Sequence, residues 1–393
     1  MPDTAVTVPA SESTHQKRYF NAIDGLRLLA AVNVVWFHLE AMGGFNDLGG
    51  KPGWLFRIIK GPAFHASLFF ILGGFIFATK FATKAAEFDS RAFLKKRLRE
   101  LYPLHLITTL TMAALYVIKR WGTDEVINVP KLIFSSFMHL SFLWSFCPIG
   151  SLNLNTPSWA LSAMFLCYVL LGPLLKWSIT LQSRLAVMGW MAVFFIPLTV
   201  WGLLYGAIGQ PNIYQLFHGF APVRFFEFGL GALLARFFAL RNEHKRTPLF
   251  IAARCDIVVL LLCGAVFFNL SSTVRSTKTA EWLSYHVLMI PLYLTAIYTM
   301  SIERGLFARI MAQNVVRKLG RTSFYPYLIH IPLMSVITLF CERMLNYKKF
   351  LHHPINIIIF TILLYGLSYI YVYAIRNKRR EKNVLIKSKS LNL

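Results

Sequence analysis

The chain has 393 residues, of which 56% are hydrophobic and only 15% are charged, and its mean hydropathy is +0.53. Soluble domains carry about 25% charged residues. Here apolar runs of about 20 residues recur, which is the length that crosses a hydrocarbon layer of about 30 Å as a helix. A soluble enzyme, a secreted disulfide scaffold and a disordered linker are therefore excluded. The expected fold class is all-α, a polytopic integral membrane protein with about ten transmembrane helices.

The first 18 residues are polar and lack the apolar region of a cleaved signal peptide. We predict a polar cytoplasmic tail over 1–18, a transmembrane domain over 19–376 and a basic cytoplasmic tail over 377–393. The apolar stretch 131–147 is short, so we expect it to re-enter the membrane or to lie in its interface. The ten expected spans lie at about 22–42, 64–82, 101–118, 157–175, 185–204, 221–240, 249–269, 282–300, 322–341 and 354–375.

The positions of the basic residues support this count. With the N-terminus inside, the cytoplasmic segments hold 28 Lys and Arg residues and the outer loops hold 11, while Arg27 and Arg224 lie within spans. Cytoplasmic loops carry an excess of Lys and Arg, so we expect both termini in the cytoplasm. The net charge of +24 has the same origin, and no nucleic-acid partner is expected. None of the five cysteines has a spacing that suits zinc, so no metal site is expected.

The first span holds the most informative ionisable residues, because charges inside a membrane are expensive. Arg27 and His38 share one helix face and lie about 16 Å apart along the axis. Asp24 is three residues before Arg27, a spacing at which the two side chains pair. An arginine near the inner surface and a deeper imidazole suit a long amphipathic ligand with an anionic head, with His38 as general base. The alternative is that His38 bonds a neighbouring helix and Arg27 extends to the interface.

Asp24-Gly25-Leu26-Arg27 with His38 resembles the Arg-x10-His signature of the acyltransferase-3 family, integral membrane acyltransferases that modify sugars and other acceptors. The chain continues with five further motifs in the family's order: Phe69–Phe75, Arg97–Pro103, Pro157–Ser162 with Tyr168, Arg224–Phe228 with Gly231, and Leu319–His330. Three positions depart from the family pattern, because Gly73 replaces a serine, Glu100 an arginine and Met164 a glutamate. The carboxylate missing at Met164 raises the alternative of a catalytically impaired homologue.

The resemblance implies an enzyme that moves an acyl group, expected to be acetyl, from cytosolic acyl-CoA to a hydroxyl of a carbohydrate or glycoconjugate. It implies no permanently bound cofactor, acyl-CoA as co-substrate, a glycan or glycolipid acceptor, contact with membrane lipids, and a bacterial inner membrane as the location. The donor's phosphates would meet Arg97, Arg99 and Arg27. The expected catalytic residues are His38, Arg27 and Asp24. The expected acceptor-binding residues are Trp159, Arg224, Glu227 and His330.

Simpler interpretations stand beside these assignments. The basic loop 80–99 also suits a topology signal that contacts anionic lipids. Arg224 and Glu227, three residues apart, favour a structural ion pair, and His330 suits a core hydrogen bond equally well. No Cys or Ser in the spans is spaced to pair with a base, which favours direct transfer, although an acyl-histidine is left open. The rival function is a secondary transporter or flippase, against which the chain shows no similar halves.

Overall fold

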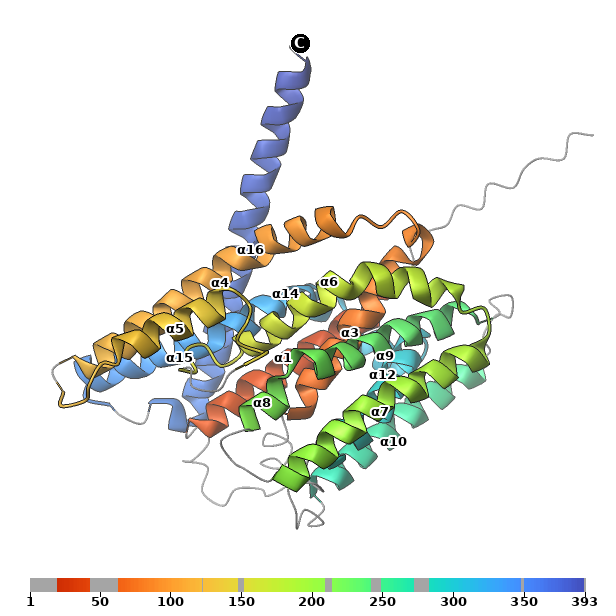
Figure 1. Cartoon of the computed structure of the whole chain (residues 1–393), viewed down its shortest axis with the longest axis horizontal. Coiled ribbons are helices and arrows are strands. Elements are labelled where there is room, and N and C mark those ends of the chain that lie inside the picture. Colours follow the sequence, from red (N-terminus) through yellow and green to blue (C-terminus); the bar gives the residue numbers. More distant parts are fainter. Residues whose placement is uncertain are drawn as a thin grey trace, which may run out of the picture.

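The computed structural model describes residues 20–42, 63–121, 123–147, 152–208, 214–241, 249–271, 283–347 and 350–391, and the regular elements among them are all helical. In chain order the helices are α1 (Asn21–Ala41), α3 (Ala63–Phe81), α4 (Ser90–Arg120), α5 (Val129–Leu140), α6 (Ser158–Thr180), α7 (Arg184–Ile208), α8 (Tyr214–Gly219), α9 (Ala221–Ala239), α10 (Leu249–Ser271), α12 (Met289–Ser301), α13 (Leu306–Met311), α14 (Asn314–Thr322), α15 (Phe324–Met344) and α16 (Pro354–Leu391) (Figure 1). A π-helical turn (Leu283–Leu288) precedes α12, and 3-10 turns occupy Ala82–Lys84 and Phe350–His352. The all-α prediction is confirmed, while the predicted tail 1–18 lies outside the described residues.

Seven helices in the described part of the chain are long and apolar enough to cross a membrane: α1, α3, α4, α6, α7, α15 and α16. The other three predicted spans also contain helices, namely α9, α10 and the pair formed by the π-helical turn and α12. Helix α9 carries Arg224, Glu227 and Arg236, and it lies in the interior of the bundle, where charges are tolerated far better than against lipid. The stretch 131–147 contains only part of α5, which rises about 18 Å and is too short to span.

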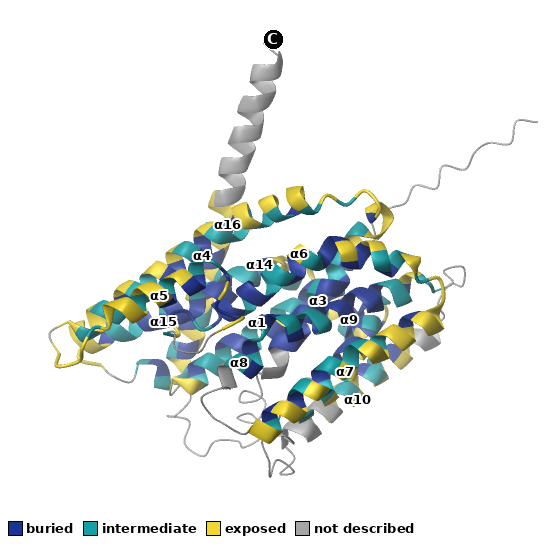
Figure 2. Cartoon of the chain, in the orientation of Figure 1, coloured by how far each residue is buried: buried dark blue, intermediate teal, exposed yellow. Residues whose placement is uncertain are grey.

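Helices α3 and α9 pack against each other at the centre of the bundle, where most residues are buried (Figure 2). A Cβ at Gly74 would collide with the carbonyl oxygen of Phe228, and a Cβ at Gly231 would collide with that of Ile71. Small residues let two membrane helices approach closely enough for extensive backbone contact. These glycines therefore set the spacing of the two central helices, to which α1 and α6 add the next layer.

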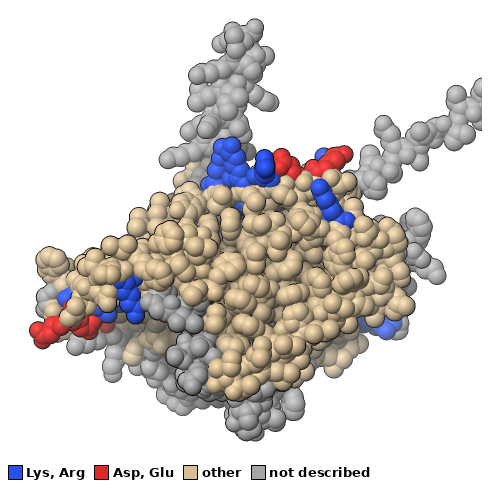
Figure 3. All heavy atoms as spheres, in the orientation of Figure 1, with Lys and Arg blue, Asp and Glu red and all other residues tan. Residues whose placement is uncertain are grey.

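The outer helices present a surface suited to hydrocarbon. Large apolar side chains are exposed along α7 and α16, including Leu185, Ile196, Ile355, Ile362 and Ile370. In Figure 3 a broad uncharged surface separates charged residues near the start of α4 from others beside the α4–α5 connection. Exposed apolar faces of this extent are stable in lipid rather than in water. The prediction of a polytopic membrane protein is confirmed.

Candidate active site

Asp24 on α1 holds two arginines from different parts of the chain. Its carboxylate is buried, with Oδ1 lying 3.6 Å from Arg27 Nη1 and Oδ2 accepting a hydrogen bond of 3.0 Å from Arg321 Nε. The contact with α14 is close, because a Cβ at Gly320 would collide with the carbonyl oxygen of Asp24. The pairing predicted between Asp24 and Arg27 is present. The second partner, Arg321, was not predicted.

His38, on the same helix as Arg27, contacts His330 of α15. His38 Nδ1 and His330 Nε2 are 3.1 Å apart, and the two ring centroids are 4.9 Å apart. His38 therefore bonds a neighbouring helix, as the simpler interpretation expected, and its assignment as general base stays a prediction. Both histidines come from motifs singled out in the sequence, but their partnership was not foreseen.

Backbone carbonyls determine which nitrogen carries the proton in each ring. His330 Nδ1 lies 3.2 Å from the carbonyl oxygen of Pro326, which can only accept, so neutral His330 has its acceptor lone pair on Nε2. His38 Nδ1 lies 3.0 Å from the carbonyl oxygen of Val34 and shares its proton between that oxygen and His330. Neutral His38 therefore keeps its lone pair on Nε2, the nitrogen that can take a proton from a substrate.

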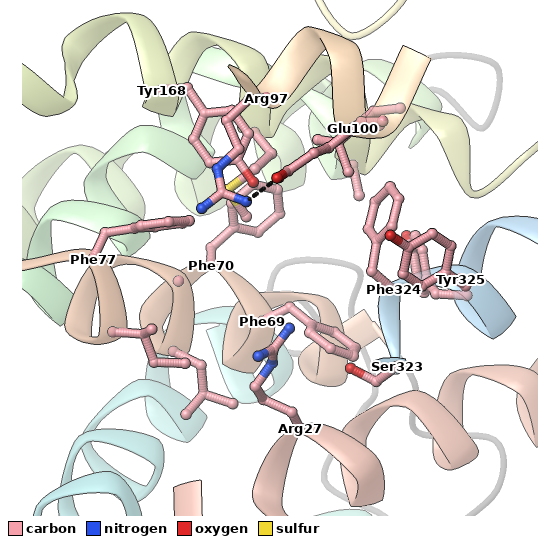
Figure 4. Close-up of a pocket in the computed structure, with 18 of the residues that line it drawn as sticks. Arg27, Phe69, Phe70, Phe77, Arg97, Glu100, Tyr168, Ser323, Phe324 and Tyr325 are labelled. Atoms are coloured by element: carbon pink, nitrogen blue, oxygen red, sulfur yellow. Dashed lines mark hydrogen bonds and ion pairs between the residues drawn. The ribbon is translucent and has the colours of Figure 1, made fainter. Parts of the chain in front are cut away.

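A cavity of about 230 Å³ lies between α1, α3, α4, α6 and the junction of α14 with α15 (Figure 4). Its wall is mainly apolar and aromatic, and Arg27 and Arg97 point into it from opposite sides. Tyr327 also lines the cavity, and its ring centroid is 6.0 Å from that of His330. Through Tyr327 the wall of the cavity contacts His330, and neither histidine is among the described residues that line the cavity.

Arg97 is fixed in this wall by aromatic stacking and by an ion pair. Its guanidinium lies 4.9, 5.2 and 5.9 Å from the ring centroids of Phe77, Phe93 and Tyr168. Aromatic faces attract cations, and Nη1 also donates to Glu100 Oε2 at 2.8 Å. Arg99 is exposed and is not among the described lining residues. Of the three arginines predicted to meet a donor, the structure thus brings Arg27 and Arg97 to one cavity, and the assignment of Arg99 stays a prediction.

The three departures from the family pattern all line this same cavity. Gly73 on α3 and Met164 on α6 face each other, because a Cβ at Gly73 would lie 3.4 Å from Met164 Cε. Glu100 supplies a carboxylate from α4. The cavity therefore has its carboxylate on α4, at Glu100. On α6, where the family pattern has a glutamate, it has the apolar thioether of Met164.

Arg224 and Glu227 form a fully buried ion pair on α9, as their spacing predicted. Arg224 Nη1 is 2.6 Å from Glu227 Oε1, which also accepts a 2.7 Å hydrogen bond from Ser67 Oγ. The guanidinium donates to the carbonyl oxygen of His218 and lies 5.4 Å from the ring centroid of Trp159. Because neighbouring groups compensate both charges, the pair ties α9 to α3 and to the end of α8. Neither the pair nor Trp159 is among the described lining residues, so their acceptor roles stay predictions.

One serine and one histidine meet in a way that sequence spacing did not suggest. Ser158 Oγ, at the start of α6, is 2.7 Å from His139 Nδ1 on α5, and His139 Nε2 is 3.3 Å from the carbonyl oxygen of Leu152. Nε2 therefore donates to that carbonyl, and Ser158 donates to Nδ1. Both side chains are buried and neither is among the described lining residues of the cavity. The contact joins α5 to α6 rather than exposing a nucleophile.

Comparison with known proteins identifies the family of this chain. Residues 20–379 match the family model described as an acyltransferase domain. A curated relative, acyltransferase MdmB of Streptomyces mycarofaciens, is 27% identical over 320 residues, which cover 79% of this chain and 77% of the relative. No solved structure matches the chain significantly. Since the family model spans the whole membrane bundle, with the His38 helix at one end and α16 at the other, this chain belongs to the acyltransferase-3 family of membrane acyltransferases.

Proposed function

We propose that this chain is an O-acyltransferase that moves an acyl group from cytosolic acyl-CoA to a hydroxyl group of a carbohydrate or glycoconjugate. Family membership gives the reaction class, and the donor and the acceptor are the proposed parts. The observation that carries the proposal is a cavity with Arg27 and Arg97 on opposite walls, one of whose lining residues, Tyr327, contacts His330 of the His38–His330 pair. An anionic donor and a base for a hydroxyl acceptor suit this combination.

The charge and length of the cavity support a donor with an anionic head and a long arm. Three arginines and one glutamate are among its described lining residues, so one positive charge remains even after Asp24 is counted. Arginine binds phosphate through two parallel hydrogen bonds. Along α3 the lining runs from Ala66 to Phe77, which is a rise of about 16 Å. With a CoA phosphate near Arg97, this length holds the end of the donor's arm, the thioester and its acyl chain.

The chemistry follows from the tautomer of His38. Nε2 takes the proton of the acceptor hydroxyl while that oxygen attacks the thioester carbonyl carbon. A C–O bond forms, the C–S bond breaks, and the proton passes to the leaving sulfur to give free CoA. Asp24 holds Arg27 toward the donor, and His330 holds the His38 ring with Nε2 available. We propose direct transfer, because Ser158, the serine that contacts a histidine, is buried against His139 and is not among the described residues that line the cavity.

We also propose that both termini face the cytoplasm of a bacterial inner membrane. The excess of Lys and Arg in alternate loops supports this orientation. Arg27 then lies toward the cytoplasmic donor and His38 lies eleven residues further out along α1. The acyl group would be transferred at a depth that an acceptor on the outer side can approach.

The test is turnover of radiolabelled acetyl-CoA and butyryl-CoA by the purified protein in lipid vesicles, with sugar acceptors added. Wild type is expected to consume the thioester, and His38→Ala is expected to lose about 100- to 10,000-fold in rate. His353→Ala is the matched control, because His353 is exposed beside the start of α16. Acyl-CoA binding without turnover in wild type would indicate an impaired homologue. Absence of binding would overturn the donor assignment and favour transport.

A further inference from the structure

We infer that the cavity accepts an acyl chain longer than acetyl, and that Gly73 and Met164 set the length of the chain. This inference rests on the proposed function, because it specifies the donor of the same site. It concerns one wall of the cavity, formed by α3 and α6. The charged groups come from the other elements around the cavity, α1, α4 and the α14–α15 junction.

The wall formed by α3 and α6 is apolar and contains small residues. Its described lining residues are Ala66, Phe69, Phe70, Leu72, Gly73, Ile76, Phe77, Ala160, Leu161, Met164 and Tyr168. Ala66, Gly73 and Ala160 leave space between the larger side chains, and no Asp, Glu, Lys or Arg stands among these residues. From Ala66 to Gly73 the wall rises about 10 Å along α3. A flexible alkyl chain fits such a surface, whereas an acetyl group would leave most of it uncovered.

At Gly73 the space between α3 and α6 has room for little more than one methyl group. A Cβ there would be 3.4 Å from Met164 Cε and 3.4 Å from Phe228 Cε2. Phe228 is fully buried in the α3–α9 core and cannot retreat, whereas Met164 is only half-buried. Methionine is unbranched and adapts to irregular space. Gly73 therefore keeps the passage open, and Met164 is the movable side chain that closes one end of it.

The chemistry of Met164 agrees with this role. A carboxylate at that position would have to be desolvated beside an alkyl chain, which is unfavourable. A thioether has no such penalty. Each methylene buried against the wall should tighten binding about fourfold. Butyryl, with two more carbons than acetyl, is therefore expected to be favoured about sixteenfold if both carbons are fully buried.

The test compares acetyl-, butyryl-, hexanoyl- and octanoyl-CoA as donors for the full-length protein in lipid, using kcat/KM for release of free CoA. Wild type should favour butyryl-CoA over acetyl-CoA by up to about sixteenfold. Gly73→Ala should shift the preference toward acetyl, and Met164→Ala should shift it toward longer chains. Met164→Glu should weaken the longer donors most. Gly189→Ala is the matched control, because a Cβ there meets no atom within 4 Å.

The outcomes separate this inference from the proposed function. If all the variants fold and turn over acyl-CoA with the wild-type length profile, or if wild type prefers acetyl-CoA, the inference is wrong and the proposed function stands. If wild type neither binds nor consumes any of the four donors, both are wrong. Because Gly73→Ala and Met164→Ala are expected to act in opposite directions, general damage to the fold cannot reproduce the predicted pair of shifts.

Discussion

Replacing His330 tests how the histidine pair works. His330 is fully buried, and its Nε2 is one of two acceptors for the His38 Nδ1 proton. His330→Phe keeps an aromatic ring of similar size but removes this acceptor. The other acceptor, the carbonyl oxygen of Val34 at 3.0 Å, remains, so His38 keeps its tautomer and loses only part of its orientation.

The magnitude follows from that remaining hydrogen bond. A neutral hydrogen bond contributes about 1 kcal/mol net, and a donor left wholly unsatisfied costs about 1–3 kcal/mol. Because the His38 Nδ1–H keeps the Val34 carbonyl as an acceptor, the expected loss is about 1 kcal/mol. A loss of about 1.4 kcal/mol would lower the rate tenfold. We expect kcat of His330→Phe to fall about fivefold with little change in KM for acyl-CoA. His330→Gln should recover part of the loss, because its amide oxygen can accept the same hydrogen bond.

The assay is steady-state release of free CoA by vesicle-reconstituted protein, with His38→Ala measured beside the two variants. His38→Ala should lose about 100- to 10,000-fold, well beyond His330→Phe. If His330→Phe lost as much as His38→Ala, His330 would itself be needed to move the proton and the tautomer assignment would be wrong. A variant with wild-type kcat would show that the hydrogen bond has no part in catalysis.

Three further expectations concern the Asp24 carboxylate with its two arginines, the packing of α3 on α9, and the His139–Ser158 contact. Asp24→Asn should destabilise the protein by about 1–2 kcal/mol, since both arginine partners are partly exposed; an unchanged thermal-unfolding midpoint would contradict this. Gly231→Ala should destabilise it by about 1–3 kcal/mol through collision with a carbonyl oxygen, while Gly189→Ala should be nearly neutral in the same unfolding assay. Burial lowers the pKa of His139 from 6.5 to about 4, so protonation favours unfolding and stability should fall as pH drops from about 6.5 toward 4. His139→Gln should weaken that acid sensitivity in unfolding scans between about pH 7 and 5, and an unchanged sensitivity would exclude His139 as its cause.

Contacts within one helix were predictable from the sequence. The spacing of Asp24, Arg27 and His38 placed them on one helix, and α1 runs unbroken over all three. The ion pair of Arg224 with Glu227 followed from the same geometry. Helix periodicity determines which side chains of a helix share a face, so contacts of this kind need no knowledge of the fold.

Contacts between distant helices were not predictable. Arg321 reaches Asp24 across 297 positions, and His330 reaches His38 across 292. Arg321 and His330 both belong to the motif Leu319–His330. Periodicity within one helix, however, does not indicate which other helix packs against it. The same limit applies to Gly73, Glu100 and Met164, whose common position in one cavity appears only in the fold.

Burial explains why one predicted span carries too many charges to count among the seven apolar helices. Helix α9 was predicted as a span from its apolar run, yet its charges keep it outside the seven helices that are apolar enough by composition. Its neighbours provide the missing compensation, because Ser67 and a backbone carbonyl hydrogen-bond the buried pair. A helix shielded from lipid by other helices can carry charges that a lipid-facing helix cannot.

The central claim is that His38 acts as the base and Arg27 helps to bind the donor. The most direct test measures single-turnover rates at saturating acyl-CoA, together with equilibrium donor binding, for wild type, His38→Ala and Arg27→Ala in the same vesicles. We predict that His38→Ala binds donor within about threefold of wild type but reacts at least about 100-fold more slowly. Arg27→Ala should bind donor more weakly and recover most of its rate at saturation. A wild-type rate in His38→Ala once donor is saturating would contradict the account.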